Sequence, residues 1–160
     1  MATDLKRLIE ALVENRVDFV VIGGVALVLH GSARTTGDLD VCYSRDAQNL
    51  LALELALAPL HPTLRGAPRE LPFRLDAATL RAGLNFTLTT DAGDIDLLGE
   101  VTGVGGYPEV EADTVALEVY GRRVRIMGLG MMERAKRATG RRRDLLDLAE
   151  IQEIRKRRGS

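Results

Sequence analysis

A short apolar run that ends in two glycines constrains the fold of this chain more than any other feature. Residues 19–22 are rich in β-branched side chains and predict a buried strand, which Gly23 and Gly24 end. The apolar segment 25–30 follows at once and predicts a short helix. A strand that turns directly into a helix leaves free backbone N–H groups, which favour phosphate, and glycine lets a ligand approach them closely. The alternative interpretation is a plain tight turn.

Two carboxylates follow at the start of the next predicted strand, residues 39–43. Asp38 and Asp40 are separated by one residue, so on a strand they point to the same face, about 7 Å apart at the backbone. Carboxylates that share a face repel each other unless a cation lies between them. The pair therefore indicates a cation site, and the alternative is that helix caps or salt bridges satisfy both groups.

A third acidic group lies in a predicted hairpin, whose strands 85–89 and 94–98 flank a glycine-containing turn. Aspartate is disfavoured in strands and costly to bury without a partner. Asp94 lies beside the turn, whereas Asp96 lies deeper among isoleucine and leucine, so Asp96 is the preferred third ligand and Asp94 the alternative. Three carboxylates on neighbouring strands can bind two magnesium ions, of which one would hold a triphosphate and the other would activate an attacking hydroxyl.

The other patterns predict an α/β (α+β) fold, a mixed β-sheet with helices on one face plus a short C-terminal helical pair. An apolar stripe predicts a helix over 5–13, capped by Thr3 or Asp4. The proline-rich segment 59–75 and the glycine-rich segment 101–107 are expected to be loops. The remaining predicted elements are helices at 46–58 and 76–82, a hairpin at 115–119 and 124–127, a helix from 131 to near 140, and a helix at 142–157. The expected organisation is a domain over 1–128 with a helical segment over 129–160 packed on it.

The composition limits which disulfides, metal sites and membrane segments the chain can have. Cys42 is the single cysteine, so an intrachain disulfide is excluded, and with two histidines a structural zinc site is disfavoured. A metal ion here is therefore expected to have oxygen ligands, which points to Mg²⁺ or Mn²⁺. No apolar run approaches the 18 residues of a membrane span, and the N-terminus does not resemble a signal peptide. We expect a cytoplasmic protein without membrane contact. His30 and Cys42 are expected to pack in the core.

Positive charge gathers near the C-terminus. The net charge is −1, but residues 133–158 hold ten basic and five acidic residues, and 19 of the 22 basic residues are arginine. Arginine has a planar fork that suits phosphate. A polyanion contact, to a triphosphate or RNA, and a solvated helix face are both compatible with this pattern.

Taken together, these motifs resemble the signature of the nucleotidyltransferase superfamily. Gly23-Gly24, thirteen residues and then Asp38-Leu39-Asp40 match its pattern, with a third carboxylate on a later strand. The fuller motif adds His30-Gly31 and Arg34-x-Thr36, and the segment 136–148 is similar to a lysine-bearing helix followed by an aspartate-rich helix. The pattern is most similar to the small bacterial branch that includes the abortive-infection nucleotidyltransferase toxins. The resemblance covers about residues 5–100 and 129–155.

The resemblance implies a magnesium-dependent transfer of a nucleoside monophosphate from a nucleoside triphosphate to a hydroxyl, with release of pyrophosphate. The acceptor would be RNA such as a tRNA end, a protein or a small molecule. Asp38, Asp40 and Asp96 would be the metal-binding and catalytic residues, with Asp96 as general base. The implied nucleotide-binding residues are Gly23, Gly24, Arg34, Thr36 and Lys136. Of these, Arg34 and Thr36 would either order the site or contact the triphosphate.

The chain departs from larger family members, because only about thirty residues stand where those carry a substantial C-terminal domain. This suggests that a homodimer or a partner protein completes the site. One alternative function is a non-catalytic nucleotide-binding module or one half of a toxin–antitoxin pair. Another is nucleic-acid binding through residues 142–157, which ranks last because acidic residues interrupt the basic face.

Overall fold

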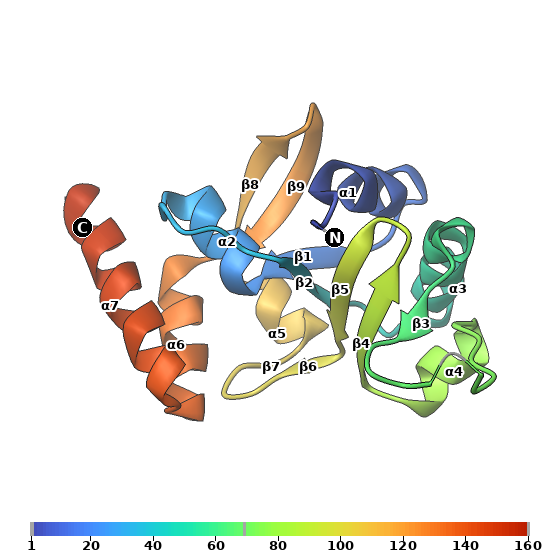
Figure 1. Ribbon diagram of the computed structural model, residues 1–160. Helices are drawn as coiled ribbons and strands as arrows, with labels where there is room; N and C mark the ends of the chain where they lie inside the picture. The colour runs from blue at the N-terminus through green and yellow to red at the C-terminus, as the bar shows by residue number, and fades with distance from the viewer. Residues whose placement is uncertain (1, 69, 160) are drawn as a thin grey trace.

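The computed structural model describes residues 2–68 and 70–159 of the chain. In this part, seven strands form one mixed sheet in the order β3-β4-β5-β2-β1-β9-β8 (Figure 1). At its centre β2 runs parallel to β5 and β1 runs parallel to β9, while the other pairs are antiparallel. The strands are β1 (Phe19–Ile22), β2 (Asp38–Tyr43), β3 (Thr63–Leu64), β4 (Asn85–Thr90), β5 (Gly93–Leu98), β8 (Thr114–Val119) and β9 (Arg122–Met127).

Helices surround this sheet, and two of them end the fold as a pair (Figure 1). The helix α1 begins as expected, because the Asp4 side chain accepts a hydrogen bond from the backbone N–H of Arg7 at 3.1 Å. The helices are α1 (Leu5–Glu14), α2 (Gly23–His30), α3 (Ala47–Leu57), α4 (Ala77–Ala82), α5 (Tyr107–Glu111), α6 (Leu129–Thr139) and α7 (Arg142–Arg157). None of the helices described is long and apolar enough to cross a membrane.

The two faces of the central strands differ in chemistry. Leu39 and Val41 of β2 are fully buried, as are Ile95 and Leu97 of β5, and they belong to the same core as the buried leucines of α1 and α3. The intervening positions on β2 and β5 carry aspartates that are only partly buried. Alternation at period two thus places the apolar residues in the core and the carboxylates on the other face. The expected mixed sheet and C-terminal helical pair are confirmed.

The structure differs from the expectation in the two predicted loops. Segment 59–75 begins within the short 3₁₀ helix η1 (Ala58–Leu60) and contains strand β3, which pairs with β4 at the sheet edge. Residue 69 lies outside the described part. Segment 101–107 contributes to a small hairpin of β6 (Glu100–Val101) and β7 (Gly105–Gly106), and α5 follows it. These elements are short, and β3 also depends on a partner distant in the sequence, so local composition does not reveal them. The expected boundary between residues 128 and 129 stays a prediction, and residues 1 and 160 lie outside the described part.

Candidate metal and phosphate site

The register between β2 and β5 brings the predicted carboxylates together. Asp38 lies opposite Asp94, and Asp40 lies opposite Asp96. One carboxylate oxygen from each of Asp38, Asp40 and Asp96 lies within 4.8 Å of the others. Asp94 is differently placed, because its Oδ1 accepts a hydrogen bond of 3.0 Å from the Thr89 hydroxyl. The geometry therefore groups Asp96, rather than Asp94, with the other two.

The two glycines let the start of α2 lie against this cluster. Gly23 has a φ of +67°, and a Cβ at this position would overlap Oδ2 of Asp40. A Cβ on Gly24 would lie 2.8 Å from the hydroxyl oxygen of Thr36, which itself donates a 3.4 Å hydrogen bond to the Asp38 carbonyl. The cap residue Ile22 offers no side-chain hydrogen bond to the first N–H groups of α2. The helix start thus combines free backbone donors with close approach to the carboxylates.

Electrostatic strain is concentrated on Asp40. Burial, together with repulsion from Asp96 and Asp38, raises the pKa of Asp40 to about 7. Its Oδ1 atom is buried without a hydrogen-bond partner. A buried carboxylate oxygen left without a donor is what a hard divalent cation satisfies, and an all-oxygen donor set suits Mg²⁺ or Mn²⁺. The residues present therefore fit such an ion.

Arg65, which the sequence did not single out, directly follows β3 and reaches the same cluster. Its guanidinium lies 2.9 Å from Asp96 Oδ1, 3.3 Å from Asp94 Oδ2 and 3.7 Å from Asp38 Oδ2. Segment 59–75 was expected to be an exposed loop, so its arginines carried no signal. The residue becomes visible only through the pairing of β3 with β4 and of β4 with β5.

The predicted cations Arg34 and Lys136 line the same cavity, but α7 holds both. Arg34 forms ion pairs with Asp147 and, at 2.9 Å, with Glu150. The Lys136 ammonium lies 3.0 Å from Asp147 Oδ2 and 3.5 Å from Oδ1 of the buried Asp144. The cavity measures about 530 Å³, and its lining includes both glycines, Thr36 and the three clustered carboxylates. All eight predicted site residues thus line one cavity.

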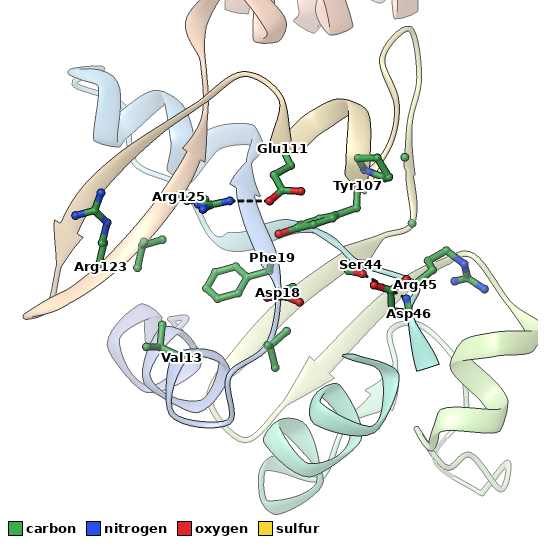
Figure 2. Close-up of a pocket in the computed structure, with 15 residues that line it drawn as sticks. Val13, Asp18, Phe19, Ser44, Arg45, Asp46, Tyr107, Glu111, Arg123 and Arg125 are labelled. Atoms are coloured by element: carbon green, nitrogen blue, oxygen red, sulfur yellow. Dashed lines mark hydrogen bonds and ion pairs between the residues drawn. The ribbon is translucent and has the colours of Figure 1, made fainter. Parts of the chain in front are cut away.

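A second cavity of about 650 Å³ lies at the other end of the central strands (Figure 2). It borders Phe19, at the start of β1, and Ser44, just past the end of β2. Its charges are mixed, and Arg125 and Glu111 form an ion pair of 2.9 Å within it. On β2, four residues, roughly 13 Å, separate Asp40 from Ser44 of this cavity. This larger cavity is therefore not part of the same site.

His30 and Cys42 lie in the core, as the sequence led us to expect. His30 Nε2 lies 2.7 Å from the carbonyl oxygen of Met127, and burial lowers the pKa of the imidazole. Burial raises the pKa of the Cys42 thiol to about 12. Neither group is placed for chemistry with the carboxylate cluster.

Comparison with known proteins gives a likeness of structure without one of sequence. No family model matches the chain, and no curated protein matches it. The lincosamide antibiotic adenylyltransferase LnuA, solved with lincomycin bound, superposes with a TM-score of 0.58 over 96% of this chain and 99% of its own, at 12% identity. A nucleotidyltransferase candidate from Thermotoga maritima gives a TM-score of 0.58 over 93% of this chain and 90% of its own, at 16% identity. The chain therefore has a nucleotidyltransferase-like fold.

Proposed function

We propose that this protein is a metal-dependent nucleotidyltransferase that transfers a nucleoside monophosphate from a nucleoside triphosphate to a hydroxyl. The observation that carries the proposal is the convergence of oxygens from Asp38, Asp40 and Asp96 within 4.8 Å, directly beside the Gly23 turn. The fold shared with nucleotidyltransferases adds support to this geometry. The site carries the proposal, because a fold alone does not determine the chemistry.

The three aspartates would hold Mg²⁺ or Mn²⁺, which when bound supplies positive charge to the triphosphate. The free N–H groups at the start of α2 would hold phosphate oxygens that Gly23 and Gly24 let approach. A bond then forms between the acceptor oxygen and the α-phosphorus, the bond from the α-phosphorus to the bridging oxygen breaks, and pyrophosphate leaves. The acceptor proton passes to bulk water.

Asp96 was expected to be the general base, and its surroundings favour a different role. The guanidinium of Arg65 lies 2.9 Å from Asp96 Oδ1, so this oxygen already faces a positively charged partner. We therefore assign Asp96 to holding the ion through its other oxygen.

The remaining predicted residues divide into two groups. Lys136 presents an ammonium to the cavity, and we assign it to the triphosphate. Arg34 is tied to α7 by Asp147 and Glu150, and Thr36 packs against Gly24, so we assign both to ordering the segment before Asp38. The ion pairs between Lys136 and the aspartates of α7 support the C-terminal part of the resemblance to the abortive-infection branch.

The acceptor is proposed at the level of chemical class. LnuA was solved with lincomycin, which supports a small-molecule hydroxyl as one acceptor class beside RNA and protein. The exposed Arg143 lines the cavity, as does Arg141, which pairs with Asp144, and such arginines suit an acceptor with phosphate groups.

The test is calorimetric titration of the four nucleoside triphosphates, with and without Mg²⁺, followed by transfer assays with α-labelled triphosphate. The double variant Asp38→Asn/Asp40→Asn should lose magnesium-dependent binding and transfer. The matched control is Asp18→Asn, an exposed carboxylate that lines the other cavity. Transfer that persists in the double variant would contradict the proposal. Binding without transfer to any acceptor would favour a non-catalytic nucleotide-binding module.

A further inference from the structure

Arg65 is placed by the sheet in the same row as the carboxylates. Its backbone N–H donates a 3.0 Å hydrogen bond to the carbonyl of Thr87, Thr87 lies opposite Asp96, and Asp96 lies opposite Asp40. Neighbours across a sheet share a face, so these four side chains point the same way. Two strand spacings, about 9.6 Å, separate the backbone of Arg65 from that of Asp96. Only a long side chain bridges that width.

The guanidinium is anchored where it touches the cluster. Its Nη2 donates a 2.6 Å hydrogen bond to the carbonyl of Leu88, which fixes it above β4, and the side chain is only 27% exposed. From this position it forms ion pairs with Asp38, Asp94 and Asp96. It therefore covers the β5 side of the carboxylate cluster with a fixed positive charge.

The opposite side of the cluster has no such cover. Within residues 2–68 and 70–159, Asp40 forms no ion pair, and its Oδ1 is buried without a hydrogen-bond partner. Asp40 also faces the Gly23 turn, where phosphate would enter. Ion pairs thus supply positive charge on the β5 side, whereas Asp40 on the Gly23 side has only the longer-range attraction of the Lys136 ammonium.

We propose that Arg65 takes the place of one of the two metal ions expected at three clustered carboxylates, so that the site binds a single divalent ion. This inference rests on the proposed function. The ion would be held by Asp38, Asp40 and the second oxygen of Asp96, next to the triphosphate. Arg65 neutralises Asp94 and the Oδ1 side of Asp96, which removes the excess negative charge that a second ion requires.

The test counts bound ions. The protein is dialysed to equilibrium against Mn²⁺ and the α,β-methylene analogues of the four nucleoside triphosphates, and bound Mn²⁺ and analogue are measured per chain. We expect one Mn²⁺ in the wild type and in Arg65→Lys, which keeps the charge, and two in Arg65→Gln. The matched control is Arg74→Gln, whose side chain is 82% exposed, and it should bind one.

The outcomes separate this inference from the function on which it rests. Two Mn²⁺ per chain in the wild type would overturn the inference and leave the proposed function standing. One Mn²⁺ in a folded Arg65→Gln variant, checked by circular dichroism, would also overturn it. Should Arg65→Gln fail to fold, the wild-type count still decides. Binding of neither Mn²⁺ nor analogue by the wild type would contradict the proposed function itself.

Discussion

Replacing Asp40 with asparagine should stabilise the metal-free protein, although Asp40 is central to the proposed activity. The folded state raises the pKa of Asp40 from its ordinary value of 3.8 to about 7. Between these two values the folded state holds a proton that the unfolded state has released, so stability falls as pH rises through this window. At pH 8 the charged Asp40 costs up to about 4 kcal/mol of folding free energy.

Asparagine has nearly the same shape as aspartate and no charge. Its amide, however, would occupy the position where the buried Oδ1 of Asp40 has no hydrogen-bond partner. We therefore expect a net gain of about 2 kcal/mol at pH 8 in Asp40→Asn, because an unpartnered polar group retains part of the cost. For a chain of this length that gain raises Tm by about 4 to 8 °C. Near pH 4 the folded carboxyl is protonated and the cost of its charge is largely gone, so the gain should reverse and the wild type should be the more stable of the two by about 2 kcal/mol.

The assay is thermal and urea denaturation in EDTA between pH 4 and pH 8, with Asp18→Asn as the exposed control. The informative quantity is the difference in free energy of unfolding between variant and wild type, because the other carboxylates titrate in both proteins. Adding Mg²⁺ at pH 8 should stabilise the wild type and leave Asp40→Asn unchanged. A variant that is no more stable than the wild type at pH 8, or a difference that does not depend on pH, would refute the reasoning.

Three further predictions concern single positions. Gly23→Ala places a Cβ against Asp40 at a residue with positive φ, so urea denaturation should show a free energy of unfolding lower by about 1 to 2 kcal/mol. Calorimetry should show that magnesium-dependent nucleotide binding is lost, and normal binding would contradict the close packing. Asp147→Asn weakens the ion pair with Lys136 and should lower the free energy of unfolding by about 2 kcal/mol, seen as a lower urea midpoint at unchanged m-value. The buried Cys42 thiol, with its pKa raised to about 12, should react with Ellman's reagent only after unfolding, and prompt reaction of the native protein would refute its placement.

Local signals explain what the sequence could predict. The β-branched run of β1 and the glycine turn between β4 and β5 encode their elements within a few residues, and the structure has them within one residue of the expected bounds. The strand spacing of Asp38 and Asp40 likewise fixes a shared face without reference to the rest of the chain. Asp96 was grouped with this pair only because it lies further from the turn than Asp94, among isoleucine and leucine.

The positions of Arg34 and Arg65 could not be predicted from the sequence around them. The motif leaves two roles open for Arg34, ordering the site or contacting the triphosphate, and its hydrogen-bond partner Asp147 lies 113 residues away. Arg65 stands among prolines and gains its position only from the pairing of a two-residue strand. An arginine fork suits carboxylate as well as phosphate, so residue type alone does not choose between the two.

The ties between α7 and the segment before Asp38 also bear on protein synthesis. Glu150 accepts a 2.7 Å hydrogen bond from the Ser32 hydroxyl and pairs with Arg34, so a helix made late braces a segment made early. A nascent chain whose α7 is still inside the ribosome lacks this brace and the acidic partners of Lys136. The candidate site is therefore completed only when α7 has emerged and docked, and a translating ribosome would carry the chain in an unassembled state until then.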